Sequence, residues 1–203
     1  MEREYKRIQT RAELKDWLAY ETRFYKNQGK FRLMNLLLLG DNAVLRRHQI
    51  LLRKTEYYIN SGHRLLASLY KMRLLQFQVK YGMHIPPNTF GRGLHVMHVG
   101  EIDVNANARA GEDCVIHVHT SLAAGGFNDF TPRLGNGVLL FMGAIVCGDT
   151  YLADNVIVGA NSVVTRSVYE ENVTVAGNPA QIVSHKGRID MDERLRKEKE
   201  SKT

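Results

Sequence analysis

The stretch that decides the fold is residues 134–169, which read LGNGVL LFMGAI VCGDTY LADNVI VGANSV VTRSVY. Every sixth residue of this run, counted from its first, is leucine or valine, and the fifth residue of each hexad is small or β-branched. A unit this short cannot bury its own apolar face, so several units must stack on one another. The run therefore predicts a stack of repeated units.

Earlier hexads extend the pattern towards the N-terminus, with an interruption between the two sets. We interpret each hexad as one short flat strand plus a corner, and three hexads as one triangular coil. The first side chain of each hexad then points inward, and the small fifth side chain fits the tight corner. The pattern predicts a left-handed parallel β-helix over residues 85–185, whose earlier hexads begin at Phe90, Val96, Val104, Ala110 and Ile116.

A small α-helical N-terminal region is predicted over residues 1–84. Thr10 and Glu13 have the spacing of a capping box, and apolar residues recur at helical intervals after them. Pro86 and Pro87 forbid further helix beyond this region. The predicted helices run from Thr10 to Gly29, from Asp41 to Asn60 and from His63 to Tyr81.

The net charge of +7 is unevenly distributed along the chain. Residues 1–84 hold 17 Lys and Arg against 7 Asp and Glu, whereas residues 85–185 hold 4 against 9. The charged C-terminal tail, residues 186–203, holds 7 against 5 and is interpreted as a solvated helix or a frayed end. The basic helical region indicates either solvated helix faces or attraction to an anionic membrane surface or an acidic polymer. It does not predict nucleic-acid binding.

The expected cellular location rests on three features that the sequence does not show: a disulfide framework, a membrane-spanning run and a signal peptide. Two cysteines, Cys114 and Cys147, do not suggest a disulfide framework, and reduced thiols are expected. The longest apolar run, Leu33–Leu39, is too short to span a bilayer, and no signal peptide is recognised. We therefore expect a cytoplasmic protein, with peripheral contact at the inner membrane face as a further hypothesis.

Two motifs carry a resemblance to a known family. Residues 85–98 read IPPNTFGRGLHVMH, and residues 159–183 contain GANSVVTRSV and NVTVAGNPAQIV. Both resemble the serine acetyltransferase-like branch of the hexapeptide-repeat acyltransferases, especially the shorter members found in polysaccharide biosynthesis clusters. The resemblance implies a homotrimer, or a dimer of trimers, with acetyl-CoA in the groove between two β-helices.

His98 aligns with the catalytic histidine of that family. Acetyl transfer to a hydroxyl needs a base for the hydroxyl proton, and histidine suits this because its pKa lies near neutral pH. If both reactants are held together, the acetyl group passes directly without a covalent enzyme intermediate. We expect His98 to be the general base and acetyl-CoA the co-substrate.

The residues around His98 depart from the serine enzymes. The two carboxylates expected near the catalytic histidine align with Met83 and Met97. The sequence leaves open which group orients His98, although Glu101 and Asp103 are nearby in sequence.

The acceptor-binding loop departs as well. The family's arginine and histidine for the amino-acid acceptor align with Phe130 and Thr131, so the charges that a free amino acid needs are missing. The acceptor is therefore expected to be a sugar or saccharide hydroxyl, contacted by Met97, Phe130 and Thr131.

Two further histidines, His117 and His119, are candidates for the acceptor cleft. A polar surface pair is the plainer interpretation of both. A zinc site built from His95, His98, His117 and His119 is a third possibility, but the spacing of these residues does not match that of the β-helix carbonic anhydrases. No metal is expected.

Acetyl-CoA is expected to lie mostly against backbone, because larger side chains would block the pantetheine arm. Basic side chains near the end of the repeat are candidates for the CoA phosphates. The full set of candidates is Ala123, Ala124, Gly125, Gly143, Ala144, Gly159, Ala160, Arg166 and Lys186.

Three functions remain open from the sequence. The first is an acetyl-CoA-dependent O-acetyltransferase with a saccharide acceptor. The second is a serine O-acetyltransferase of cysteine biosynthesis, which the missing loop charges disfavour. The third is a non-catalytic β-helix used as an assembly scaffold, which would not bind CoA.

Overall fold

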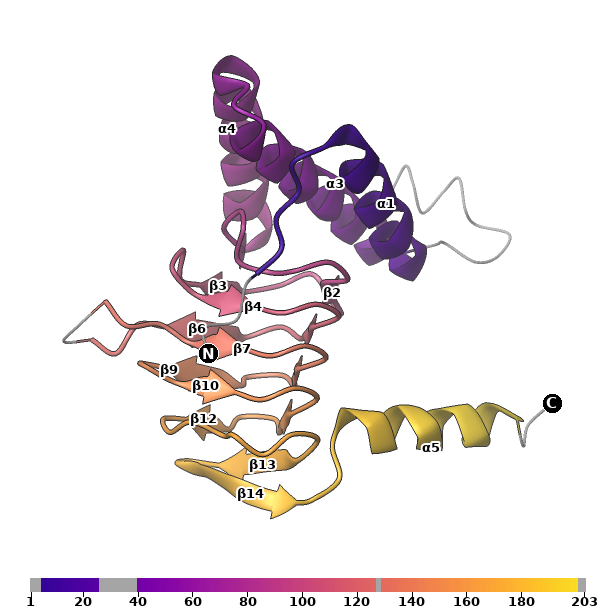
Figure 1. Ribbon diagram of the computed structural model, residues 1–203, viewed down its shortest axis with the longest axis vertical. Coiled ribbons are helices and arrows are strands. Elements are labelled where there is room, and N and C mark those ends of the chain that lie inside the picture. The colour runs from indigo at the N-terminus through magenta and orange to yellow at the C-terminus, as the bar shows by residue number, and fades with distance from the viewer. Residues whose placement is uncertain (1–4, 26–39, 127–128, 201–203) are drawn as a thin grey trace.

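The computed structural model describes residues 5–25, 40–126 and 129–200. Its first part holds α1 (Arg11–Glu21), the 3-10 helix η1 (Thr22–Tyr25), α3 (Asp41–Asn60) and α4 (Arg64–Tyr81). Short strands follow, and α5 (Arg188–Glu200) comes last. Figure 1 shows the first helices gathered above a stack of strands, with α5 leaving the lower end of that stack.

The strands form three sheets that the chain visits in turn. The sheets have the orders β1-β3-β6-β9-β12, β4-β7-β10 and β2-β5-β8-β11-β13-β14. All neighbours are parallel except β13 and β14. The strands are β1 (Met83–His84), β2 (His95–Val96), β3 (Ile102–Val104), β4 (Arg109–Ala110), β5 (Val115–Ile116), β6 (Thr120–Ala123), β7 (Arg133–Leu134), β8 (Leu139–Leu140), β9 (Ile145–Cys147), β10 (Tyr151–Leu152), β11 (Ile157–Val158), β12 (Val163–Val164), β13 (Thr174–Gly177) and β14 (Ala180–Ser184).

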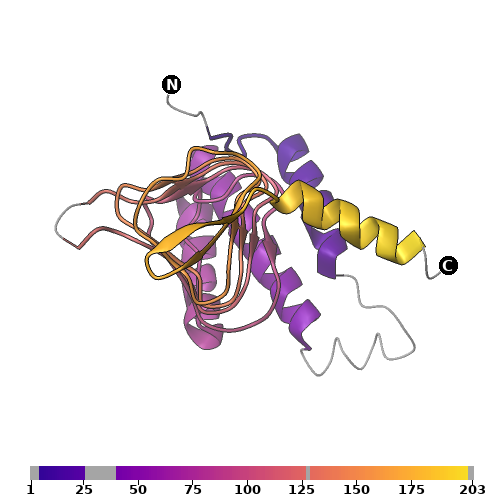
Figure 2. The same ribbon diagram turned by 90° about the horizontal axis from the view of Figure 1, so that it is seen from below.

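The strand register matches the predicted coil of three hexads. Arg133 pairs with Tyr151, Leu139 with Ile157 and Ile145 with Val163, so in-register residues lie 18 positions apart in this part. The coil that contains the loop after β6 is longer, and Val115 there pairs with Leu139. Viewed along the stack, the coils superpose on one another (Figure 2). The predicted parallel β-helix is therefore confirmed.

The two periodic positions of the hexad form the core of the coil. All eleven first positions are at most 3% exposed, from Phe90 to Val164. Most fifth positions are enclosed as well: Gly100 and Val168 are half-buried, whereas the fully buried ones include Ala108, Cys114, Val138, Ala144 and Val156. The hexad thus fills the interior with one large and one small side chain per face, as predicted.

The helical region also follows the prediction closely. The capping box of Thr10 and Glu13 is present, and Gly82 ends α4 in the left-handed conformation with a φ of 71°. α3 begins at Asp41, but its N-cap is Gly40 rather than Asp41. The predicted helix end at Gly29 lies outside the described residues. In the described part of the chain, no helix is both long and apolar enough to cross a membrane, and Cys114 and Cys147 are free thiols.

A buried ion network joins the helices to the first coil. The Arg53 guanidinium of α3 is fully buried and uses all five of its N–H donors. It donates to the Glu21 carboxylate of α1, to the Glu56 carboxylate and to the carbonyls of Phe90 and Gly91. This one side chain therefore bonds to both helices and to the coil.

The carboxylates of this network are bonded in turn. Glu21 accepts from the Gly93 backbone N–H at 2.8 Å and from the Gln49 amide at 2.6 Å. Glu56 accepts from the Asn88 backbone N–H at 2.9 Å. Because a buried charge is costly unless it is paired and hydrogen-bonded, losing one partner leaves the others unsatisfied.

We predict that Arg53→Met lowers the free energy of unfolding by about 3–5 kcal/mol, because two carboxylates are left without their cation. Arg46→Met is the matched control, since Arg46 lies on the same helix and is exposed. Chemical denaturation of the two variants measures the difference. Equal stability of both variants would show that the network does not hold the helices to the coil.

Candidate active site

His98 lies at the corner that follows β2 and leads to β3. Its side chain is exposed, and its ring centre is 6.2 Å from that of His117. His117 follows β5 one coil further on and is half-buried, 5.2 Å from the ring of Phe141 in the next coil. Because Val96, Ile116 and Leu140 are in register, these coils bring His98 and His117 together although they are 19 residues apart.

The carboxylates near His98 in sequence are paired with other histidines. Asp103 is 3.1 Å from His84, and Glu101 is 3.8 Å from His119. Met83, where the related enzymes carry a carboxylate, is fully buried in the coil. Among the described residues, the ring contact with His117 is the interaction that His98 makes. In the single chain, Glu101 and Asp103 are therefore engaged with His119 and His84 rather than with His98.

The surroundings of His117 disfavour its charged form. Burial lowers its pKa from the ordinary value, and the neighbouring His98 lowers it further. A neutral imidazole can donate one hydrogen bond and accept another, so His117 can help to position a polar ligand beside His98.

His95 and His119 have different surroundings. Burial lowers the pKa of His95 to about 4, with Arg188 and His117 adding to the effect, and its ring stacks on Phe24 at 4.4 Å. His119 is exposed at a tight corner with a φ of 60°. The described residues do not form a group of three or more ligands that could hold a metal ion, so the four histidines of the zinc hypothesis do not converge within one chain.

Two of the small residues expected to contact acetyl-CoA, Gly159 and Ala160, follow the same corner as His98. Val158 is in register with Leu140, so Gly159 and Ala160 continue the column below His117 and Phe141. Ala160 is exposed at this corner. The corner therefore presents His98 at one end and small residues further along.

Two of these positions are small for a reason inside the coil. Gly143 has a φ of 72°, and an added Cβ would lie 2.1 Å from the Asn161 Oδ1. A Cβ on Gly159 would lie 3.1 Å from that of Ala176. Ala144 is fully buried, so its methyl group does not reach a groove. Coil stacking accounts for the small size of these residues, and their expected backbone contact with acetyl-CoA stays a prediction.

The loop after β6 lies at a different corner from His98. Ala123 and Ala124 are half-buried, and the exposed Gly125 donates its N–H to the Phe130 carbonyl at 3.3 Å. Phe130 is 58% exposed, whereas Thr131 is buried. The expected contact of Thr131 with the acceptor stays a prediction. The loop joins β6 to β7, whereas His98 joins β2 to β3, so one chain does not bring them together.

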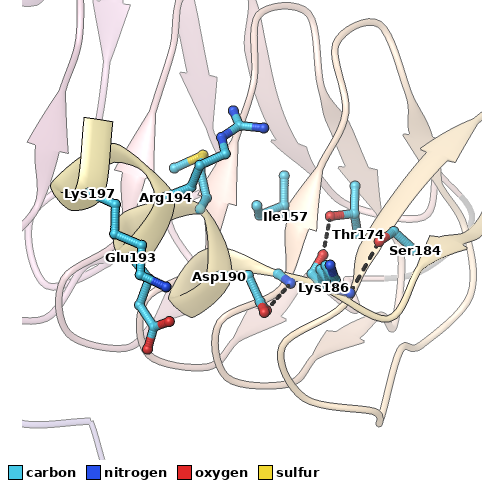
Figure 3. A pocket seen from close by; sticks show the side chains of 10 residues that line it. Ile157, Thr174, Ser184, Lys186, Asp190, Glu193, Arg194 and Lys197 are labelled. Atoms are coloured by element: carbon cyan, nitrogen blue, oxygen red, sulfur yellow. Dashed lines mark hydrogen bonds between the residues drawn. The ribbon is translucent and has the colours of Figure 1, made fainter. Parts of the chain in front are cut away.

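Lys186 lines a pocket of about 560 Å³ between α5 and the sheet of β11 and β13. Figure 3 shows that α5 contributes Arg194 and Lys197 to the same pocket, together with Asp190 and Glu193. Ile157 and Met191 supply apolar surface. Arg166 is exposed after β12 and does not line this pocket.

Arg194 and Lys197 were missed because the tail was interpreted as a solvated or frayed end. The signal for them was present in their spacing, since residues three apart lie on one face of a helix. The same spacing relates Met191 to Arg194, so this face of α5 combines an apolar residue with cations.

We predict that His117 titrates below pH 6.5, its ordinary value, because burial and His98 both disfavour its charged form. In His98→Asn the pKa of His117 should rise part of the way, since burial remains. Imidazole proton NMR over a pH series measures both values. His185→Asn, an exposed histidine paired with Glu170, is the control that should leave His117 unchanged. A pKa of His117 that falls or stays fixed in His98→Asn would contradict the coupling.

Comparison with known proteins agrees with the repeat. The family described as bacterial transferase hexapeptide (six repeats) matches residues 131–166. The serine acetyltransferase of Synechococcus elongatus is 30% identical over 140 residues, which is 63% of this chain and 57% of the relative. The putative colanic acid biosynthesis acetyltransferase WcaB of Escherichia coli K12 is 40% identical over 95 residues, 46% of this chain and 58% of the relative. The chain thus spans less than two thirds of these relatives.

A solved serine acetyltransferase in complex with CoA superposes with a TM-score of 0.64 and 25% sequence identity. The superposition covers 85% of this chain and 71% of that one, so it includes helices as well as coils. In fold, in repeat and in sequence, the chain resembles the hexapeptide-repeat acyltransferases of the serine acetyltransferase-like branch, a branch whose members include a colanic acid acetyltransferase.

Proposed function

We propose that this chain is an acetyl-CoA-dependent O-acetyltransferase that works by direct transfer, with His98 as general base. The observation that carries the proposal is the exposed His98 beside His117, at the corner that continues into Gly159 and Ala160. The names of the relatives, which are acetyltransferases, support the same reaction.

The reaction is a proton transfer coupled to acyl transfer. The acceptor oxygen attacks the thioester carbonyl carbon while a ring nitrogen of His98 takes the hydroxyl proton. The carbon–sulfur bond then breaks, and the departing thiolate takes that proton from His98. His117, neutral and adjacent, is suited to hold the acceptor by a hydrogen bond.

Acetyl-CoA in this proposal follows the corner of the coil. The pantetheine arm passes Ala160 and the backbone of Gly143 and Gly159, with the thioester near His98. Lys186 and the cations of α5 supply positive charge for the phosphates at the lower end of the coil. Ala123, Ala124 and Gly125 keep their proposed contact with the cofactor, and Arg166 remains a weaker phosphate candidate because it does not line the pocket with Lys186.

A trimer can bring the loop after β6 and a carboxylate to the His98 corner, which one chain does not do. In a ring of left-handed β-helices, the loop of one chain can approach the His98 corner of its neighbour, although the two lie on different corners of one chain. A carboxylate of the neighbour can then orient His98. The same proposal divides the chain into the helical region 1–84, the β-helical transferase domain 85–185 and the tail 186–203. Two such trimers can associate further as a dimer of trimers.

A saccharide hydroxyl is the proposed acceptor. Exposed Phe130 offers an apolar surface for a sugar ring, and Met97 packs beside the His117 column without adding charge. The colanic acid relative supports a sugar, whereas the serine acetyltransferase relatives support serine as the alternative acceptor. Peripheral contact with an anionic membrane surface belongs to the same proposal, because saccharide acceptors can be carried on lipids.

We predict that His98→Ala reduces acetyl-CoA consumption by about 100-fold or more, since general bases contribute at least this much. The assay offers nucleotide sugars, oligosaccharides and free serine to the full chain and measures release of the free thiol. Consumption with saccharides but not with serine is the expected pattern of acceptors.

His185→Ala is the matched control, because His185 is exposed and remote in sequence from the His98 corner. Normal turnover by His98→Ala would remove the general base from the proposal. Failure of the wild-type chain to bind CoA in calorimetry would favour the scaffold alternative.

A further inference from the structure

α4 carries two apolar faces, and the structure covers one of them. Leu74 and Gln78 are buried, and Phe77 packs against the main core. The other leucine, methionine and valine side chains of α4 are exposed, and Leu65 and Val79 reach 89% and 76%. The exposed set is Leu65, Leu66, Leu69, Met72, Leu75 and Val79, which we call the outer face of α4.

Helical geometry gathers this set on one side. At about 3.6 residues per turn, the outer face lies opposite Leu74 and Gln78. The same spacing puts Arg64 and Lys71 along one border of the outer face and Arg73 and Lys80 along the other. α4 contains four cations and no Asp or Glu. An exposed apolar stripe with basic borders is typical of a helix that lies in a membrane interface.

A groove between α3 and α4 continues from one of these borders. It has a volume of about 380 Å³, and Arg47 of α3 and Arg73 of α4 flank it. Ile50, Leu51 and Phe77 form its apolar lining. Two guanidinium groups at an apolar groove match the phosphate and the first carbons of a phospholipid.

Charge distinguishes between the possible occupants of the outer face. Two copies of α4 packed face to face would bring their basic borders together without any acidic side chain on either helix. Like charges held close in this way oppose association. An anionic surface instead pairs with all four cations and accepts the apolar side chains. Figure 1 shows α4 projecting at the end of the molecule opposite β14, where a flat surface can approach it.

We propose that the outer face of α4 docks the protein onto an anionic phospholipid bilayer. The apolar side chains enter the headgroup and acyl boundary, and the bordering cations pair with lipid phosphates. Arg47 and Arg73 hold one headgroup at the groove. This inference rests on the proposed function in one respect, that a saccharide acceptor carried on a lipid would be met at such a surface.

The experiment is vesicle co-sedimentation of the full chain, over a salt series. The vesicles are phosphatidylcholine alone or an equal mixture of phosphatidylcholine and phosphatidylglycerol. Binding is expected with the mixture only, and salt should weaken it. Leu65→Gln/Val79→Gln should weaken it at least about tenfold, because two apolar side chains no longer enter the boundary. Arg64→Gln/Lys71→Gln should weaken it about 30-fold.

Matched controls separate the outer face from general charge. Arg11→Gln/Lys15→Gln removes two exposed cations of α1, so the loss of charge is the same. Ile182→Gln/Val183→Gln removes two exposed apolar side chains of β14. Both should bind vesicles nearly as well as the wild type. If the controls and the α4 variants lose binding equally, the outer face is not the docking surface.

Two other measurements decide the remaining outcomes. Light scattering reports the mass of Leu65→Gln/Val79→Gln, and a smaller assembly with unchanged vesicle binding would identify a second copy as the occupant and overturn the proposal. Wild-type protein that stays in solution with the anionic vesicles would overturn it as well. Acetyl-CoA consumption with a soluble acceptor should be unchanged in the α4 variants. His98→Ala should still sediment with vesicles. Failure of docking and failure of catalysis are therefore distinguishable.

Discussion

The buried guanidinium of Arg53 is the constraint on which the arrangement of the molecule depends. It is hydrogen-bonded to α1, to its own helix and to the first coil. A shift of any of these parts would leave a buried charge without its partner. The carbonyls that it holds, those of Phe90 and Gly91, come directly before β2 and the His98 corner. Strand register then carries that placement from coil to coil. The first hexad, which leads to the candidate base, is therefore anchored by a side chain from outside the repeat.

The sequence predicted the parts of the fold that follow from local repetition. Residues six apart face the same interior, so Leu134, Leu140 and Val146 could be assigned inward positions before any contact was known. The network around Arg53 could not be found in this way, because Glu21 and Glu56 look like ordinary surface charges in a basic helical region. Their partners are distant in sequence, and only packing brings them together. The same reason hid the pocket of Lys186, whose second wall is the charged tail.

In the candidate site too, contacts that follow from the repeat could be predicted and contacts that depend on packing could not. The proximity of His98 and His117 follows from coil register and was foreseeable. The partners of Glu101 and Asp103 could not be predicted, because several histidines lie near these corners and the repeat does not show which of them each carboxylate contacts. Thr131 and Ala144, two of the candidates for ligand contact, are buried in this chain because the base of the loop and the fifth position of the hexad both face the interior. A repeat therefore predicts which way a strand residue faces much better than what a corner residue contacts.

The two ends of the coil are closed by different means, and this bears on how the protein can vary in length. The upper end is sealed by helices through an ion network, and the lower end by β14, which reverses direction against β13 and leaves the parallel sheet without a matching edge. Neither closure depends on how many coils lie between them. A complete coil of 18 residues inserted in the middle would lengthen the corner below His98 and leave both seals untouched. The architecture thus separates the length of the coil from the stability of its ends, so that one can change without the other.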